Sequence, residues 1–258
     1  MQIETKAILM GLLALTSNAS FAGEWDGETS AVVSVPAEAK ADDQAVGWPT
    51  LSGTVQFGYE STHLFRGVDS GGGDPIVWAS AMFSPFEGMN LGVWYGTGPD
   101  TDYEELDLVA DYTFDLEYVA ATAGVVWYDF PGGFADDSTD FFVKFSREFE
   151  PVPGFLVTPY LNHVFNESAD GWYFEGGVNL KKPLSDRVTL SLTGWLAAST
   201  GYRDDDGLDN ATVSLSLPVS LSEQAALVPY VSASAALDAL DSTGGDEVSA
   251  GATLVVRF

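Results

Sequence analysis

The side chains that could perform acid–base or nucleophilic chemistry are few in this sequence, and their spacing does not suit a reaction. The 258 residues contain two histidines, His63 and His163, and no cysteine. His163 follows Asn162, but adjacent residues of a strand face opposite ways, and no nearby serine motif supplies a nucleophile. An aspartate one residue away from either histidine is also missing. Because no acid–base constellation can be named, the sequence predicts no catalytic residue and no enzyme.

The patterns that most resemble ion-binding or phosphate-binding motifs also fail on spacing. When Gly207, which follows three aspartates, is aligned with the EF-hand glycine, Tyr202 takes the place of the first aspartate and Val213 that of the glutamate. Gly71-Gly72-Gly73 is not followed by the Lys-Ser/Thr of a phosphate-binding loop. Without cysteine, thiolate zinc sites are excluded. We therefore expect no cofactor and no metal site, and loose binding of divalent cations by the acidic loops stays open.

The charge of the chain excludes a further class of partner. Asp and Glu number 38 against 10 Lys and Arg, which gives a formal net charge of -28. Binding of nucleic acid relies on Lys and Arg contacts with phosphates, so we expect no nucleic-acid partner. Hydrophobic residues make up 46% of the chain and aromatic residues 13%, so the composition is not that of a disordered acidic protein.

The first fifty residues divide into two segments that lie outside the predicted folded domain. Residues 1–22 have a basic residue, an apolar core and the small-x-small sequence Ser20-Phe21-Ala22, which together predict a signal peptide. Residues 23–50 are acidic, rich in Ala, Ser and Pro, and without periodicity, which predicts a flexible periplasmic leader. The alternative for this leader is a segment that folds back into the domain as a plug.

Residues 51–258 consist of short alternating segments separated by turn residues, the pattern of β-strands. The expected strands are 51–61, 75–84, 90–97, 103–114, 119–128, 140–149, 155–165, 172–182, 188–199, 208–218, 225–237 and 247–258. Their even number and their length of about ten residues are typical of an all-β, transmembrane antiparallel up-and-down β-barrel. Val248–Phe258 must then pair with the strand that begins at Leu51, because lipid does not tolerate an open sheet edge.

The connections favour a membrane barrel over a soluble β-sandwich, which would show the same alternation. Short connections, such as 85–88, 115–117 and 184–186, alternate with longer ones, such as 62–74 and 129–139. Short periplasmic turns and longer outer loops are expected when both ends of the domain lie on the periplasmic side. A sandwich has no reason to sort its loops in this way.

Alternation also assigns residues to the two faces of the barrel wall. Aromatic rings prefer the membrane interface, so we expect interface anchors at Trp127, Trp172 and Phe258. Charged residues of a membrane strand must face water. The residues that we therefore expect to line the pore are Glu60, Arg66, Asp107, Asp111, Lys144, Glu175 and Lys181. Two strands, 75–84 and 155–165, alternate poorly, and their faces stay unassigned.

The loops near the outer mouth contain many acidic residues and few basic ones. The acidic outer mouth comprises Asp100, Asp102, Asp136, Asp137, Asp204, Asp205 and Asp206. It is a solvated surface, a region whose negative field concentrates cations, or both. Arg66 either pairs in the lumen with an acid such as Glu60, shaping a constriction, or anchors its loop through carbonyl groups.

Four segments of the first half of the domain have a distinctive sequence: Tyr59-Glu60-Ser61-Thr62-His63-Leu64-Phe65-Arg66-Gly67-Val68, Leu91-Gly92-Val93-Trp94, Glu105-Leu106-Asp107-Leu108-Val109-Ala110-Asp111-Tyr112 and Gly124-Val125-Val126-Trp127-Tyr128-Asp129-Phe130-Pro131. These segments resemble the TorF-type porin family. The match covers roughly residues 53–131, and the second half only through its hairpin pattern. The resemblance implies an outer-membrane barrel that conducts small solutes. It also implies that Phe258 belongs to the C-terminal signal read by the barrel-assembly machinery.

The sequence thus predicts a Gram-negative outer-membrane barrel for passive diffusion of small hydrophilic solutes, favouring cations or neutral molecules. Its expected partners are the lipid bilayer of the outer membrane, the barrel-assembly machinery and small solutes. Twelve strands should leave only a narrow lumen. The alternative is a non-conducting barrel that serves as a structural or adhesive surface protein, or as a partner in an envelope complex.

Overall fold

A computed structural model describes residues 52–240 and 244–258, and every regular element in these ranges is a β-strand. The strands are β1 (Ser52–Glu60), β2 (Leu64–Phe65), β3 (Val68–Asp69), β4 (Ile76–Phe86), β5 (Met89–Thr97), β6 (Glu104–Asp115), β7 (Ala120–Asp129), β8 (Ser138–Ser146), β9 (Phe149–Val152), β10 (Phe155–Asn166), β11 (Gly171–Pro183), β12 (Thr189–Thr200), β13 (Gly207–Ser216), β14 (Val219–Ser220), β15 (Ala225–Ala236) and β16 (Glu247–Arg257). No helix in the described ranges is long and apolar enough to span a membrane. The predicted signal peptide and leader lie outside the described residues.

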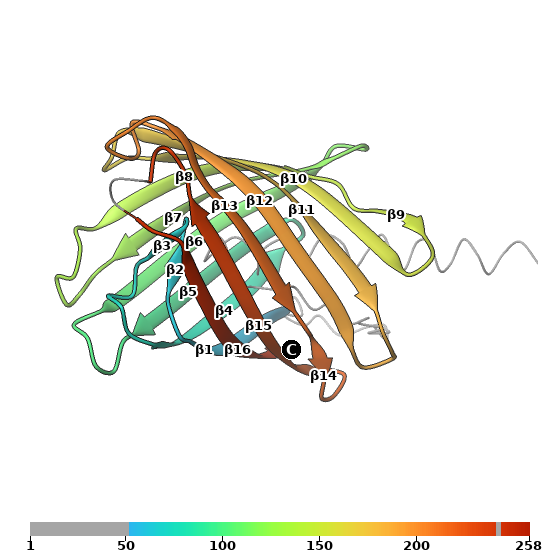
Figure 1. Ribbon diagram of the computed structural model, residues 1–258. Coiled ribbons are helices and arrows are strands. Elements are labelled where there is room, and N and C mark those ends of the chain that lie inside the picture. Colours follow the sequence, from blue (N-terminus) through green and yellow to red (C-terminus); the bar gives the residue numbers. More distant parts are fainter. Residues whose placement is uncertain (1–51, 241–243) are drawn as a thin grey trace, which may run out of the picture.

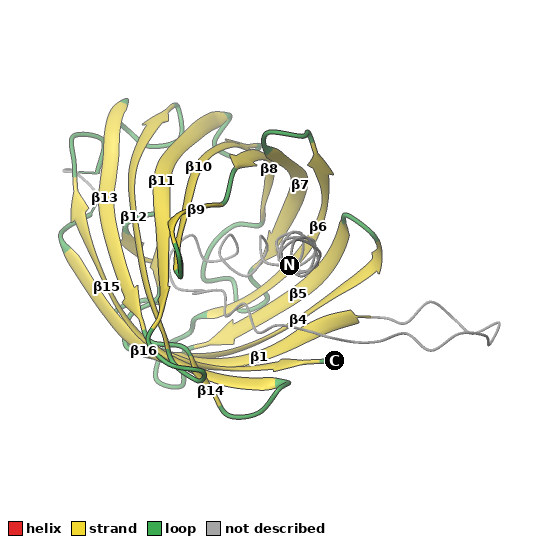
Figure 2. Ribbon diagram, turned by 90° about the vertical axis from the view of Figure 1, so that its right-hand side faces the viewer, coloured by secondary structure: helices red, strands yellow, loops and turns green. Residues whose placement is uncertain are grey.

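Twelve long strands close into an antiparallel barrel (Figure 1). Long strands that follow one another in sequence pair with each other, including β10 with β11, and the pairing of β1 with β16 closes the ring. The end-on view shows the resulting ring of strands (Figure 2). The predicted fold class and strand number are confirmed. The predicted pairing of the last strand with the first is also confirmed, since Thr54 lies opposite Arg257 and Phe57 opposite Leu254.

The two faces of the wall differ in polarity as alternation predicts. In β6, Leu108 points outward and is 45% exposed, whereas the side chain of Asp107 points inward and is only 3% exposed. Large apolar side chains are exposed all around the barrel, whereas the buried inner face carries acids, amides and hydroxyls. A soluble protein has the opposite arrangement, with apolar side chains inside and polar ones outside, so the soluble sandwich is excluded. For β4, whose face the sequence left unassigned, Ile76 and Trp78 are buried and Val77 is exposed.

The predicted strand 140–149 is divided into two elements. Strand β8 begins at Ser138 and ends at Ser146, and β9 pairs only with β10, at Val152–Phe155 and Phe149–Val157. Residues 147 and 148 separate the two strands, although the register against β10 is the same on both sides, with Ser146 opposite Tyr160 and Phe149 opposite Val157. The β9–β10 hairpin extends beyond β7, whose pairing with β8 ends at Ala120–Ser146, and its register shifts only between Phe155 and Val157.

A short hairpin lies inside the barrel at the end that carries the longer loops, which we call the outer end. The stretch from Ser61 to Pro75, which the sequence predicts as a loop, contains strands β2 and β3. They pair only with each other, Leu64 with Asp69 and Phe65 with Val68, so they are not part of the wall. Strand β1 leads directly into this β2–β3 hairpin, which therefore starts from the wall formed by β16, β1 and β4.

Candidate functional site

Arg66, at the tip of the β2–β3 hairpin, reaches the wall opposite the hairpin's starting point. One guanidinium nitrogen donates a hydrogen bond to Oδ2 of Asp140 on β8 at 2.5 Å. A second nitrogen donates to the hydroxyl of Tyr202, in the β12–β13 loop, at 2.9 Å. The guanidinium also lies 5.0 Å from the ring centroid of Tyr173 on β11. One cation thus connects an internal hairpin to three separate parts of the barrel.

The partner carboxylate is satisfied on both oxygens. The hydroxyl of Tyr128 donates to Oδ2 of Asp140 at 3.0 Å, and the amide of Asn166 donates to Oδ1 at 2.7 Å. Burial of Arg66 lowers its pKa, but the charge of Asp140 raises it further, and the net pKa lies well above its ordinary value. The guanidinium of Arg66 therefore stays ionised, and the removal of either member of the pair would leave a buried polar group without its partner.

The backbone of the hairpin tip explains why the sequence reads Arg-Gly at this point. Arg66 has φ of +48° and Gly67 has φ of +80°, the pair of positive angles that a two-residue type I′ turn requires. A Cβ on Gly67 would lie only 2.7 Å from the Cβ of Asn210 on β13. Arg203 links the tip to β13, since it donates hydrogen bonds to the carbonyl oxygen of Arg66 at 2.8 Å and to Oδ2 of Asp209 at 3.0 Å. The turn is therefore seated against the far wall through its backbone as well as its side chain.

A second polar cluster fixes the root of the hairpin. Nδ1 of His63 lies 2.9 Å from Oε1 of Glu60, and the hydroxyl of Tyr230 on β15 donates to Oε2 of Glu60 at 2.9 Å. Nε2 of His63 lies 4.0 Å from Glu105, whose carboxylate also accepts a hydrogen bond from the hydroxyl of Tyr103. Burial raises the pKa of Tyr103, which keeps its phenol neutral and able to donate. Glu60 therefore serves the hairpin root, and Arg66 pairs with Asp140 rather than with Glu60.

Aromatic and aliphatic side chains fill the space around the hairpin. The ring of Phe65 meets that of Tyr128 on β7 edge-on, with centroids 5.9 Å apart. Phe65 packs against a buried cluster that extends over β6, β7, β8, β10, β11 and β12: Val109, Val126, Tyr128, Phe142, Val164, Tyr173, Trp195 and Ala197. On the other side, His63 stacks on Trp94 at 5.5 Å, and Trp94 stacks on Trp78. The hairpin thus narrows the outer half of the lumen.

Six of the seven residues predicted to line the pore lie on the inner face of the wall at different depths, whereas Arg66 lies on the β2–β3 hairpin inside the barrel. Glu60, Arg66, Asp107, Asp111, Glu175 and Lys181 are buried, and Lys144 is half-buried with its ammonium 5.0 Å from the ring centroid of Tyr160. Asp111 accepts a hydrogen bond from Asn90 at 2.8 Å. Glu60 and Arg66 belong to the hairpin clusters, whereas Lys181 lies opposite Leu156 and Ser191, toward the end with the short turns.

The seven aspartates of the predicted acidic outer mouth are all exposed and lie in three loops at the outer end. These are the β5–β6, β7–β8 and β12–β13 loops. Two of the seven also shape their loops, since Oδ1 of Asp137 accepts from the amide of Phe130 and Oδ1 of Asp206 accepts from the amide of Gly201. In the described part of the chain, no group of three or more metal-ligating side chains could hold a metal ion.

Sequence reasoning missed three residues that hold the hairpin: Asp140, Tyr202 and Asp209. A pattern was available for Asp140, since it shares the inward parity of Phe142 and Lys144 on β8. Tyr202 precedes β13 in an irregular loop, and Asp209 and Asn210 are both buried although they are adjacent in β13. A register shift in the β12–β13 pairing, between Leu196 and Ala198, breaks the alternation there, so no periodic pattern could have found them.

The outer surface carries the predicted interface anchors in exposed positions. Trp127 is 38% exposed, Trp172 is 44% exposed and Phe258 is 59% exposed. Exchanged backbone hydrogen bonds of 3.0 and 3.1 Å join Phe258 to Gly53 at the seam between the first and last strands. A closed barrel with an apolar outer face and a polar inner face is the form in which single chains span the outer membrane of Gram-negative bacteria, so this protein is located there.

Comparisons with known proteins agree with this fold. Residues 43–239 match the model of a family described as "Bacterial protein of unknown function (Gcw_chp)". Among solved structures, one titled "KdgM porin" matches with a TM-score of 0.50 at 10% identity, over 80% of this chain and 98% of that one. A second, titled "NanC porin structure in rhombohedral crystal form", matches with a TM-score of 0.54 at 10% identity, over 80% of this chain and all of that one. A search of curated proteins found no match.

These findings bear on the resemblance to TorF-type porins. Its coarser content, an outer-membrane barrel with the fold of a porin, is confirmed by the two structures. The family that the chain matches carries a different name, so membership of the TorF type stays a prediction.

Proposed function

We propose that this chain, which belongs to the bacterial family of unknown function Gcw_chp, is a porin-like channel for passive diffusion of small hydrophilic solutes. The observation that carries the proposal is the polar inner face of a closed membrane barrel. Below the hairpin, the buried inner positions include Asp111, Ser191, Ser214 and Ser216. Buried polar side chains on the inner face of a membrane barrel have a role when water and solutes pass along them.

The β2–β3 hairpin sets the size of solute that the channel accepts. It crosses the outer half of the lumen from β1 to Asp140 on β8 and Asn210 on β13, and aromatic rings surround it. A twelve-stranded barrel is narrower than the porins of sixteen strands or more. We therefore expect passage of ions and small polar molecules only, beside the hairpin.

Selectivity should favour cations or neutral solutes. Among the described residues, the buried carboxylates are Glu60, Glu105, Asp107, Asp111, Asp140, Glu175 and Asp209, against the buried cations Arg66 and Lys181. The seven exposed aspartates of the acidic outer mouth add negative charge where solutes enter. Fixed negative charge at a low-dielectric opening concentrates cations and repels anions. We propose no catalytic step, because His63 and its neighbours bind one another and hold the hairpin root.

Single-channel recording in a planar bilayer under a salt gradient tests this function. The proposal expects discrete conductance steps and a reversal potential of the sign that cations produce. A purified and folded protein that gives no conductance would refute the channel, and a reversal potential of the opposite sign would refute the acidic mechanism of selectivity.

The second candidate is a non-conducting barrel with a structural, adhesive or envelope-complex role. The specific observation in its favour is the same hairpin, since Phe65 and Arg66 join a continuous cluster between opposite walls. If this candidate holds, the wild-type protein stays closed at all voltages, whereas release of the hairpin by replacement of Arg66 produces conductance.

Phe258 also bears on how the barrel is assembled in the membrane. We propose that the last strand, which ends in this exposed aromatic ring at the seam, is read by the barrel-assembly machinery.

A further inference from the structure

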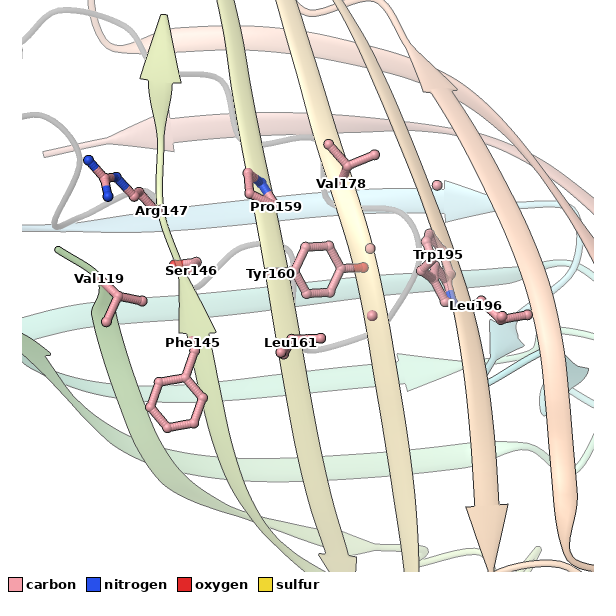
Figure 3. A pocket seen from close by; sticks show the side chains of 13 residues that line it. Val119, Phe145, Ser146, Arg147, Pro159, Tyr160, Leu161, Val178, Trp195 and Leu196 are labelled. Carbon is pink, nitrogen blue, oxygen red and sulfur yellow. The ribbon is translucent and has the colours of Figure 1, made fainter.

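A groove of about 720 Å³ lies on the lipid-facing side of the wall formed by β8, β10, β11 and β12 (Figure 3). Its apolar lining includes Phe145, Pro159, Leu161, Val178 and Leu196. Phe145, Leu161 and Leu196 are exposed and belong to the outward-facing set, so the groove opens toward lipid and not toward the lumen.

Two glycines at outward positions create the groove. Leu161 pairs with Phe145 on one side and with Gly176 on the other, and Gly176 pairs with Leu196. These four residues therefore form one row across the wall, in which only Gly176 lacks a side chain. In the next row Pro159 pairs with Val178, and Val178 pairs with Gly194. Glycine within a strand weakens it and often marks a place where another molecule approaches closely.

The groove has a closed floor. The ring of Tyr160 covers Gly177 from the inner side, where a Cβ on this glycine would lie 2.6 Å from the ring. Trp195, a buried inward residue of β12, also lines the floor. The groove is therefore a slot in the wall and not an opening into the lumen.

Arg147 provides a positive charge at one end of the slot. Its backbone amide donates to the carbonyl oxygen of Pro159 at 3.3 Å, which puts Arg147 in the same row as Pro159, Val178 and Gly194. Its guanidinium points sideways, away from the other lining residues (Figure 3). Arg147 lies between β8 and β9, toward the end of the barrel that carries the short turns and faces the periplasm.

The acids next to Arg147 in sequence are engaged elsewhere. Glu148 acts electrostatically on Lys181, which lies on the lumen side, and the carboxylate of Glu150 accepts a hydrogen bond from the amide of Gly154. In the described part of the chain, no carboxylate forms an ion pair with Arg147. An exposed arginine at the membrane interface with these neighbours is suited to a phosphate group.

We propose that this groove binds one phospholipid of the periplasmic leaflet, with its phosphate on Arg147 and an acyl chain along Pro159 to Gly194. From β8 to β12 the row crosses three strand spacings, or about 14 Å, which is the shape of a slot for a chain. Lipid surrounds the barrel in any case, so burial from water favours no particular lipid here. Selective retention comes from close packing at the glycines and from the phosphate–guanidinium contact.

Native mass spectrometry of the full-length protein, released from micelles that contain equal amounts of a phosphatidylglycerol and the matching diacylglycerol, tests the proposal. We expect the wild-type protein to retain one phosphatidylglycerol. Gly194→Leu fills the slot and should lower the retained fraction at least fivefold. Arg147→Gln should lower it at least fivefold and remove the preference over diacylglycerol. Ala250→Leu, at an exposed position on β16, and Arg187→Gln, in an exposed turn, are the controls and should retain the lipid.

Three results would overturn the proposal. They are a wild-type protein that retains no lipid, equal retention by Gly194→Leu and its control, and a wild-type dimer that Gly194→Leu alone dissociates. The last result would assign the groove to a second copy of the chain. If Gly194→Leu does not assemble, Gly176→Val tests the same slot, because a Cβ at Gly176 meets only Leu161, at 3.2 Å.

Discussion

The guanidinium of Arg66 lies 2.5 Å from the carboxylate of Asp140, although the two residues start from opposite walls of the barrel. Arg66 lies on a hairpin that follows β1, and Asp140 lies on β8, five strands away from β1 in the ring of twelve. The ion pair therefore closes a connection across the lumen that neither wall could make alone.

Replacement of Arg66 by alanine should release the hairpin and leave Asp140 as an uncompensated buried charge. We expect a loss of about 3–5 kcal/mol in the free energy of unfolding, together with a larger or noisier single-channel conductance. Denaturant unfolding in micelles and planar-bilayer recording measure the two effects. Arg187→Ala, in an exposed turn, is the matched control. Unchanged stability and conductance in Arg66→Ala would contradict the role of the hairpin.

A comparison of Gly67→Ala with Gly73→Ala distinguishes the cost of backbone strain from the cost of losing the contact between the hairpin tip and Asn210. Both glycines have positive φ, +80° and +91°, so either substitution should cost about 1–2 kcal/mol of strain. Only Gly67 lies against Asn210, whereas a Cβ on Gly73 meets nothing within 4 Å. Gly67→Ala should therefore be the more destabilising substitution in a thermal melt. Equal effects would show that the contact with Asn210 does not hold the tip.

The inner acids should set the preference for cations. Asp107→Asn and Asp111→Asn remove charge and keep the shape of the side chain, so the hydrogen bond from Asn90 to residue 111 can persist. We expect the cation-to-anion permeability ratio, measured from the reversal potential, to move toward one. Asp186→Asn, in an exposed turn at the other end, should leave the ratio unchanged. A ratio that stays at its wild-type value in both inner variants would mean that ions do not pass these residues.

The acidic outer mouth should act only at low salt. Replacement of Asp204, Asp205 and Asp206 by asparagine should lower cation conductance by roughly twofold at 0.1 M salt, where the Debye length is about 10 Å. At 1 M salt the Debye length falls to about 3 Å, and the variant and wild type should then conduct equally. Conductance measured over this range of salt is the test. A difference that persists at 1 M would indicate a structural effect, such as loss of the contact from Asp206 to the amide of Gly201.

Phe258→Ala should reduce the yield of assembled barrel. The backbone bonds to Gly53 can still form, but the ring that covers Gly53 is lost, since a Cβ there would lie 2.8 Å from the Phe258 ring. Heat-modifiable migration on gels measures the folded fraction in outer-membrane preparations. Phe86→Ala, which removes another exposed ring from a strand end, is the control and should assemble normally. Equal folded fractions would remove Phe258 from the assembly signal.

The sequence alone determined the twelve long strands, their antiparallel closure and the polarity of the two faces. Each follows from local information, because a period of two divides Leu108 from Asp107 wherever the wall is continuous. The outward aromatic rings could be placed by the same rule, and the exposed aspartates of the mouth by the alternation of short and long connections.

Only the tertiary structure decided what the irregular segments do. The hairpin at Leu64–Asp69 returns into the lumen because of a turn at Arg66-Gly67 and contacts with Asp140, Tyr202 and Asn210, which are remote in sequence. The lipid-facing slot likewise depends on the register that puts Gly176 beside Leu161 and Gly194 beside Val178. Alternation assigns a face to each residue, but it does not say which residues of neighbouring strands meet. That depends on the register, which closure of the whole ring fixes.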